Sequence, residues 1–444
     1  MNMPSMNHPL SAVLLAVLAC PLWAAAQSPL TLDEAVRRAA NNNPGVKAAK
    51  ASEAEAGSRV DEARAVWFPK IDLSESIQRG NQPVFVFGSL LGQRHFAAEN
   101  FAIDALNHPD AITNVRTAVG VEQAVFDLGR MTSGIRAARL GAEMAGWGTR
   151  DVAQALKVAA THAYGRVLMA QARGRAAAAA VAAAAEDVAR VEHRRDAGLA
   201  TEGDVLGLRV HLSHMRQGAI EAAGQESVAR AELNDVMGDP IDTTFQLEEP
   251  RPPVADDRGV HPETDTASLT RRTDVARATL ASQLATVQIA ASRAAMLPQA
   301  AVQGVYEFNG QSFGSQASSW TVGAVVRWNL FAGMADAARA RAARAALDRA
   351  NAEREQVESH ARVELRSAQT RFETARARWE VAQGTRAQAQ ESQRIIRDRY
   401  DAGLAPVNDV LRAATAVLDS NVAYTTALVD LFISRALIER AQGQ

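Results

Sequence analysis

Aromatic residues are scarce in this sequence: they make up 5% of its 444 residues, whereas charged residues make up 22%. A chain rich in alanine, arginine and glutamate with few aromatics is typical of long helices that pack closely on one another. Lysine and arginine (48) nearly balance aspartate and glutamate (50). The sequence therefore lacks the basic footprint of a nucleic-acid-binding protein, and we expect no nucleic acid among its partners.

Cysteine is almost absent, because Cys20 is the only one. This excludes an intrachain disulfide and any site built from several thiolates. Proline is absent from residues 110–239 and 299–405, as long uninterrupted helices require. Five prolines cluster instead between Pro240 and Pro262, which predicts a largely irregular connection there.

Catalytic signatures are missing too: there is no Gly-x-Ser-x-Gly, no phosphate-binding glycine loop and no His-Glu-x-x-His. We therefore expect no catalytic residue, no cofactor and no resident metal, and the chain is not interpreted as an enzyme. His211 and His214, with Met215, lie at helical i, i+3 spacing and form the one candidate metal relay. Solvated surface residues are the ordinary interpretation of such a pair.

The N-terminus carries a short apolar run, Leu10–Ala19, that is too brief to span a bilayer. Pro21 and the small residues Ala24–Ala26 follow, which predicts a secretory signal over residues 1–26, although no lysine or arginine precedes the run. Lipidation of Cys20 is the alternative, since residues 17–20 loosely match a lipoprotein cleavage box. The longest later apolar run, Ala176–Ala185, is also too short to cross a membrane, so an exported chain of this kind is periplasmic, secreted or an outer-membrane β-barrel.

An internal repeat organises the rest of the chain. The segment Asp196–Ala200 and the following Asp204-Val-Leu recur 205 residues later as Asp401–Ala405 and Asp409-Val-Leu. Upstream the offset becomes 229 residues, pairing Val46 with Val275 and Pro69 with Pro298. The first copy thus carries 24 extra residues between Pro69 and Phe126. We expect residues 80–111 to form an enlarged extracellular connection, with a cap over an outer mouth as the alternative role.

In each copy the spacing of apolar residues changes along the sequence, from the alternation of strands to the periodicity of helices. Residues 115–121 and 320–328 alternate as strands do, with weaker strand patterns at 71–77 and 300–308. Helical patterning follows for about 65 residues, or roughly 100 Å. Gly198 and Gly403 then supply the left-handed conformation that ends a helix, and Asp204 and Asp409 start the returning helix, where negative charge is favourable.

The repeat divides the chain into a first copy at 27–239, a Pro-rich linker at 240–271 and a second copy at 272–444. Each copy is predicted to contain a helix, two strands and a long helical hairpin, with tips near 196–204 and 401–409. The fold is therefore mainly α with a small β part. Four strands cannot close a barrel, and a lipid-facing sheet must close, so copies from several chains must share one barrel.

These segments resemble the TolC-like outer-membrane efflux proteins over nearly the whole mature chain. The two Asp-Ala-Gly-Leu-Ala-x-x-x-Asp-Val-Leu segments carry the resemblance most specifically. The runs at 125–130 and 329–333, and Leu233-Asn234 with Met237-Gly238, also fit the family. The resemblance implies a homotrimer whose four strands per protomer form a twelve-stranded barrel in outer-membrane lipid. An α-helical barrel of coiled-coil hairpins would continue into the periplasm as a tunnel, with the Pro-rich linker as an equatorial belt.

The resemblance also assigns roles at the tips. The Gly-Leu turns (Gly198, Leu199, Gly403 and Leu404) match the surface that meets a periplasmic adaptor, or membrane fusion protein. Asp204 and Tyr400 match residues that hold the tunnel entrance closed, and Asp409 matches an acid that forms a ring at the constriction. Ala405 and Arg412 depart from the family, because they replace a basic gate residue and a second ring acid.

Trp320 and Trp328 stand at the two ends of an apolar strand face and are predicted to form a membrane girdle. Tryptophans buried in a soluble hairpin are the alternative. The resulting hypothesis is a passive exit duct for small toxic compounds, drugs or metal ions. It would serve a tripartite efflux or type I secretion system with an inner-membrane pump of the RND, ABC or MFS type. A soluble periplasmic coiled-coil scaffold or adhesin is the alternative.

Overall fold

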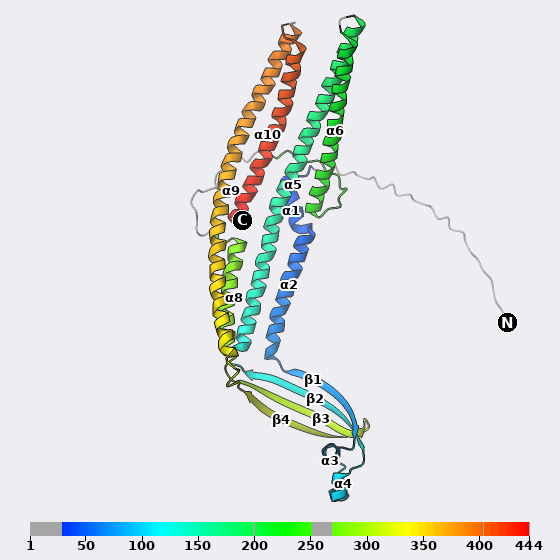
Figure 1. Cartoon of the computed structure of the whole chain (residues 1–444), viewed down its shortest axis with the longest axis vertical. Helices are drawn as coiled ribbons and strands as arrows, with labels where there is room; N and C mark the ends of the chain where they lie inside the picture. Colours follow the sequence, from blue (N-terminus) through cyan, green and yellow to red (C-terminus); the bar gives the residue numbers. More distant parts are fainter. Residues whose placement is uncertain (1–28, 199, 251–268, 403, 444) are drawn as a thin grey trace, which may run out of the picture.

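The computed structural model describes residues 29–198, 200–250, 269–402 and 404–443. The predicted signal segment 1–26, Cys20, Leu199, Gly403 and much of the linker lie outside the described residues. The chain is strongly elongated, with a four-stranded sheet near one end and two helical hairpin tips at the other (Figure 1). It is mainly helical with a small β part, as the sequence predicts.

Both halves contain a helix, two strands and two long helices in the same order, and the first half has additional short helices. The first half contains α1 (Leu32–Asn42), α2 (Pro44–Arg64), η1 (Ala65–Trp67), β1 (Lys70–Gly80), α3 (Pro83–Gly92), η2 (Ala98–Phe101), α4 (Ile103–Asn107), β2 (Ile112–Phe126), α5 (Arg130–Asp196) and α6 (Glu202–Met237). The second half contains α8 (Thr273–Ala294), β3 (Gln299–Ser312), β4 (Ser315–Arg327), α9 (Ala335–Asp401) and α10 (Val407–Ala441).

Helices α5 and α9 are each 67 residues long, close to the length that the sequence predicts. Each begins after a left-handed turn: Gly129 has φ 100° before α5 and Gly333 has φ 60° before α9. Basic side chains occupy the last turn of α5, where they complement the negative end of the helix dipole (His193, Arg194 and Arg195).

Helix α5 is the centre of the helical layer, because it packs against α6 and α2 on one side and α10 and α8 on the other. The largest core cluster forms where Tyr164 and Val167 of α5 meet Leu233 and Met237 of α6 and Val429 of α10. Residues 412–441 of α10 are long and apolar enough to cross a membrane, but this helix lies against α9 and α5. Within the described chain 28% of its most apolar window is buried.

In both copies, the glycine that follows the last helix packs closely against the backbone near the start of that copy. Gly238 follows α6 and Gly443 follows α10, with φ of 73° and 75°. A Cβ built on Gly238 would lie 2.8 Å from the backbone of Asn42, and one on Gly443 would lie 2.8 Å from the backbone of Arg271. Asn42 and Arg271 are 229 residues apart, and Gly238 and Gly443 are 205 residues apart. These separations are the two offsets of the internal repeat. Glycine is thus required twice, at equivalent positions, by both conformation and close approach.

The sheet has the order β1-β2-β3-β4, and every neighbouring pair is antiparallel. The central pair, β2 with β3, joins the two copies, and its register shifts once, between Ala124 and Phe126. Strands β1 and β4 each pair on one side only within the described chain. The sheet is therefore open at both edges.

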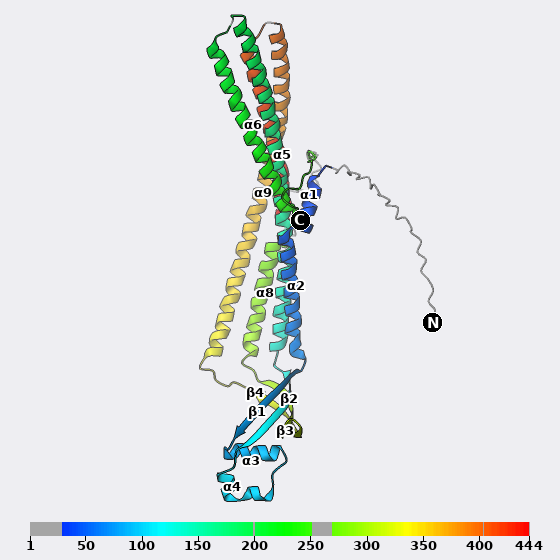
Figure 2. The ribbon, with the colours of Figure 1, turned by 90° about the vertical axis from the view of Figure 1, so that its right-hand side faces the viewer.

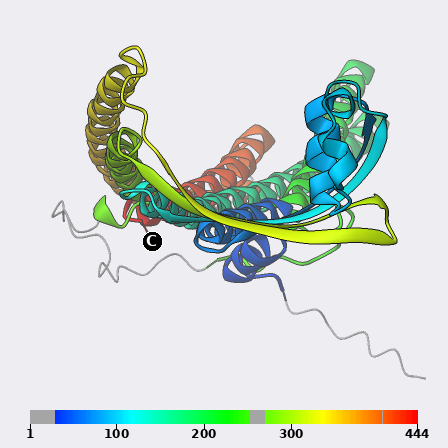
Figure 3. The ribbon, with the colours of Figure 1, turned by 90° about the horizontal axis from the view of Figure 1, so that it is seen from below.

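Sheet and helices together form a trough. Viewed along the long axis, the strands curve, and α1 lies on the convex side (Figure 3). In the orthogonal view α1 again stands out from one side, while α3 and α4 lie toward the other (Figure 2). The concave side of the trough therefore carries the insertion of the first copy.

Candidate functional site

One face of the sheet is mainly apolar and exposed, with one polar pair on it, in which the Thr117 hydroxyl donates to the Glu75 carboxylate at 2.6 Å. Its cross-strand register places Leu73, Val119, Tyr306 and Trp320 in one row, each directly opposite the next. Leu73 is 74% exposed and Trp320 72%. The same face continues with Ile71, Ile77, Val121, Val302, Val322 and Val326. A row of large exposed apolar side chains across four strands is what contact with lipid requires.

The other face is polar. Arg116 of β2 and Glu307 of β3 form an ion pair across it at 2.6 Å, and Ser319 of β4 donates to the same carboxylate at 3.3 Å. Residues of the same alternation include Asp72, Ser74, Gln78, Asn114, Gln303, Asn309 and Thr321. Apolar residues facing outward and polar residues facing inward define the wall of an outer-membrane barrel rather than of a soluble sandwich.

Trp320 and Trp328 have different surroundings. Trp320 lies within β4, opposite Tyr306, whose ring packs edge-on against Phe308 at 5.1 Å. Trp328 lies just beyond β4, is 59% exposed, and donates its indole N–H to the carbonyl oxygen of Met296 at 3.1 Å. The residue alternation puts both on the apolar side, Trp320 near the middle of β4 and Trp328 at the helical end of the sheet.

The inserted segment is ordered rather than a plain connection. Gln93, directly after α3, donates to the carbonyl oxygen of Thr113 (2.9 Å) and to Oδ1 of Asn114 (2.8 Å). Asn114 in turn donates to Oδ1 of Asn309 at 3.0 Å. Because Asn114 and Asn309 belong to the polar face, α3 lies on the inner, concave side of the sheet (Figure 3).

Further contacts hold this inserted segment at the end of the sheet far from the helices. Arg94 donates to the carbonyl oxygen of Ser318 in β4 at 3.0 Å. Phe87, Phe96 and Phe101 form two edge-on ring contacts, at 4.9 and 5.0 Å. Helix α3 was not predicted from the sequence, although Pro83 before the apolar run Val-Phe-Val-Phe is a helix-start signal.

The first tip is built on a reciprocal cap. Thr201 accepts a hydrogen bond from the Asp204 N–H at 3.2 Å, and Asp204 accepts from the N–H and the hydroxyl of Thr201 at 2.9 and 2.7 Å. These bonds lower the pKa of the Asp204 carboxyl below its usual range. Gly198, with φ 75°, has open space where a Cβ would lie. Asp204 thus stabilises the start of α6 within its own chain.

At the second tip, the returning helix α10 begins without the reciprocal cap found at the start of α6. Pro406 precedes α10 and provides no side-chain cap, while Asp409 lies in the first turn. The N–H of Leu404 donates to the carbonyl oxygen of Arg399 at 2.8 Å, and the Leu404 side chain is 70% exposed. Tyr400 belongs to the last turn of α9. No contact between Asp204 and the second tip appears among the described residues.

His211 and His214 are both exposed on α6. Among the described residues no group of three metal-ligating side chains comes together. The structure thus brings no ligand set to this histidine pair.

Comparisons with known proteins agree with these features. A family model described as outer membrane efflux protein matches residues 35–239 and 266–444. The outer membrane channel CmeC of Campylobacter jejuni superposes with a TM-score of 0.76 at 18% identity, covering 99% of this chain and 94% of that one. VceC of Vibrio cholerae gives 0.72 at 17% identity, covering 93% and 96%. The open state of MtrE from Neisseria gonorrhoeae gives 0.73 at 16% identity, covering 93% and 88%. No curated protein matches by sequence.

The fold and the two-faced sheet define an outer-membrane β-barrel protein with a helical tunnel extending into the periplasm. The chain belongs to the outer membrane efflux protein family, whose model covers both copies of the repeat.

Proposed function

We propose that the chain is one subunit of a homotrimeric exit duct of a tripartite efflux or type I secretion system. The observation that carries this proposal is the sheet: four strands, exposed and apolar on one face, with both edge strands unpaired in the described chain. Open sheet edges do not occur in the hydrocarbon of a bilayer, so β1 and β4 must pair with neighbouring copies. Three copies of four strands give the twelve-stranded barrel that the family resemblance implies.

The helices support the same assembly. Within the described chain α9 packs mainly against α10 and α8, and α6 mainly against α5 and α1. Exposed apolar residues line these helices along their free sides (Val363, Val381 and Ile395 on α9, and Val210, Ile220 and Val228 on α6). Neighbouring subunits would cover them by packing α9 of one copy beside α6 of the next. The two sets of hairpins would then close into a helical tunnel.

The Gly-Leu turns are proposed as the docking points of a periplasmic adaptor, which would link the duct to an inner-membrane pump. Leu404 supports this role, because it is a large apolar side chain, 70% exposed at a tip. The duct would be a passive conduit for small toxic compounds, drugs or metal ions, and the pump would supply the energy. Asp204, Tyr400 and Asp409 are proposed as gate residues at the same end, and Trp320 and Trp328 as the girdle at the lipid interfaces.

The insertion between β1 and β2 is proposed to narrow the outer mouth. Its helix α3 bonds to the polar face of the sheet through Gln93, and three copies would project into one lumen. The buried side chains of Val86, Ser89 and Gln93 fix it there.

Membrane fractionation with determination of the oligomeric mass tests the proposed function. The mature protein should be recovered in the outer membrane and should migrate as a trimer in mild detergent. Recovery as a soluble periplasmic monomer or filament would support the scaffold alternative instead. A Leu404→Asp variant should still assemble but should no longer confer resistance, whereas Ile241→Asp, at an exposed apolar residue just beyond the end of α6 and far from both tips, serves as the matched control.

A further inference from the structure

The concave side of the helical layer carries arginines at the same positions in both copies. Tyr164 fixes the orientation of α5: its hydroxyl donates to the carbonyl oxygens of Leu30 (2.8 Å) and Glu248 (2.5 Å), which belong to the segments beside α1. Since α1 lies on the convex side, Tyr164 points outward (Figure 3). Desolvation of its buried hydroxyl raises the pKa of Tyr164 well above the usual range, as expected for an anchored phenol.

Arg166 and Arg173 point the opposite way on α5. At 100° per residue, positions two and nine residues after Tyr164 are rotated from it by about 200° and about 180°. Both arginines are exposed, in keeping with a position on the open concave side. Seven residues separate them, so their levels along the tunnel differ by about 10 Å.

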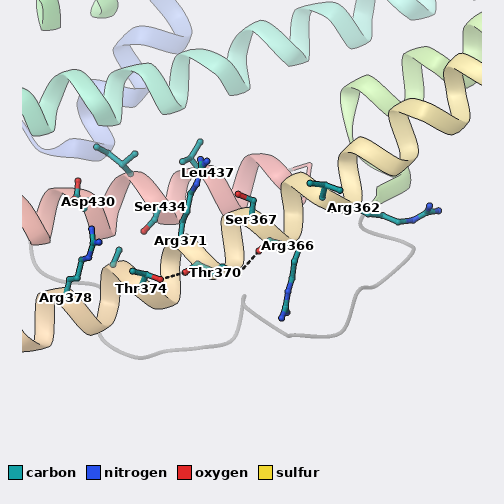
Figure 4. Close-up of a pocket in the computed structure, with 13 residues that line it drawn as sticks. Arg362, Arg366, Ser367, Thr370, Arg371, Thr374, Arg378, Asp430, Ser434 and Leu437 are labelled. Carbon is teal, nitrogen blue, oxygen red and sulfur yellow. Dashed lines mark hydrogen bonds between the residues drawn. The ribbon is translucent and has the colours of Figure 1, made fainter.

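The 205-residue offset places Arg371 and Arg378 at the equivalent positions of α9. Both line an open groove between α9 and α10, together with Asp430, Ser434 and Leu437 of α10. Figure 4 shows Arg371 lying across α10 beside Leu437 and Arg378 directed toward the side of Asp430. Each level of the tunnel thus receives one arginine from each long helix.

Acidic side chains compensate only part of this charge. Glu232 of α6 pairs with Arg166 at 2.5 Å, but its equivalent in the second copy is Leu437, so Arg371 has no acid at that position. Asp430 of α10 lies in the groove, and its equivalent in the first copy is the neutral Gln225. These four arginines therefore face two carboxylates in each subunit, and Arg362 and Arg366, which line the same groove, add further positive charge.

Two more ionisable residues, Glu364 and His162, lie near these arginines, and neither one cancels the excess positive charge. Glu364 is engaged by Arg272 at 2.5 Å and by His360 at 3.4 Å. His162 is the exposed residue on the same side of α5, one turn before Arg166. The excess of positive charge on the concave side therefore remains.

We propose that Arg166, Arg173, Arg371 and Arg378 form an arginine belt in the tunnel that favours the passage of small anionic solutes, those bearing carboxylate or phosphate groups. This inference rests on the proposed trimeric duct. Three copies would stack two rings of six guanidinium groups around one water-filled passage. Guanidinium groups bind carboxylates and phosphates through two parallel hydrogen bonds, and a charged ring raises the local concentration of counter-ions.

Reversal potentials in a KCl gradient across a planar bilayer test the belt. Wild-type channels should prefer chloride over potassium, and the preference should weaken as the salt concentration rises because the Debye length shortens. The double variant Arg371→Ala/Arg378→Ala should shift the reversal potential toward that of potassium. The double variant Arg371→Lys/Arg378→Lys, which keeps the charge, should restore the wild-type value.

Arg37→Ala is the matched control for single removals, because Arg37 is exposed on α1, on the convex side of the layer. It removes one positive charge per subunit, as Arg378→Ala does, but should leave the reversal potential unchanged. A wild-type channel that prefers potassium, or an Arg378→Ala channel that conducts with the wild-type reversal potential, overturns the belt while the duct stands. A trimer that never conducts would instead refute the proposed function.

Discussion

Single residues decide how closely the long helices approach one another. A Cβ built on Gly165 of α5 would lie 2.3 Å from Cγ1 of Val429 in α10. Valine is stiff at χ1, so it cannot turn away from a new methyl group without a shift of the helices. The central helix contact therefore depends on a residue without a side chain.

Gly165→Ala is expected to destabilise the protein by about 1–3 kcal/mol, because overpacking outweighs the better helix propensity of alanine. Gly174→Ala is the matched control on the same helix, since its new Cβ would meet only Glu226 Oε2, at 3.8 Å. Thermal unfolding in detergent should show a lower Tm for the first variant and an unchanged or higher Tm for the second. Equal Tm values would contradict the contact.

Asp204 provides a second prediction at this scale. Asp204→Ala should fray the first turn of α6, seen as faster hydrogen exchange at the Asp204 position and Val205. Asp409→Ala should change the start of α10 less, since that start has no reciprocal cap. The hydrogen bonds of Thr201 lower the pKa of Asp204, so the cap is fully formed above the ordinary aspartate pKa and is lost as the pH falls below it. A protection factor, the exchange rate relative to that of an unstructured amide at the same pH, that stays constant in this window would argue against the cap.

At the scale of elements, the repeat explains which parts could be predicted. The offset of 205 residues predicted the two long helices and their turns, because helix length needs only periodicity and an absence of proline. Strands β1 and β3 are longer than their weak patterns suggested, since pairing with neighbours extends a strand beyond its own signal.

The insertion shows where sequence patterns were insufficient. Helix α3 is ten residues long and is positioned by Gln93, whose partners Asn114 and Asn309 are remote in sequence. No periodicity reveals that polar network, because the asparagines come together only when β2 pairs with β3. The arginine belt was missed for a similar reason: which helix face is concave depends on the contacts of Tyr164 with Leu30 and Glu248.

Replacing residues 81–111 with a two-residue Asn-Gly turn tests the insertion. The register of β1 with β2 ends at Gly80 and Ile112, so a short hairpin can join them. If α3 narrows the mouth, the shortened channel should conduct more than wild type in a planar bilayer. As a control, Gly314→Ala, in the β3–β4 turn where no atom lies near the new Cβ, should leave the conductance unchanged. An unchanged conductance in the shortened channel would mean that the constriction lies elsewhere.

At the scale of the whole molecule, the structure of one chain is incomplete in two places at once. The sheet exposes apolar residues on one face and leaves both edges open, and the helical layer leaves α9 and α6 packed on one side only. Under the proposed function, both deficits would be removed by the same arrangement of copies around one axis. The charged and polar residues on the concave side would then line a continuous passage from the tips to the outer mouth.

Single-channel recording of the purified, detergent-extracted protein in a planar lipid bilayer tests this account most directly. The account predicts discrete, ohmic conductance steps from a trimer, since a barrel of twelve strands joined to a helical tunnel is a water-filled pore. A trimer that inserts into the bilayer, as shown by its protection from external protease, and yet gives no conductance under any applied voltage or adaptor addition would contradict it.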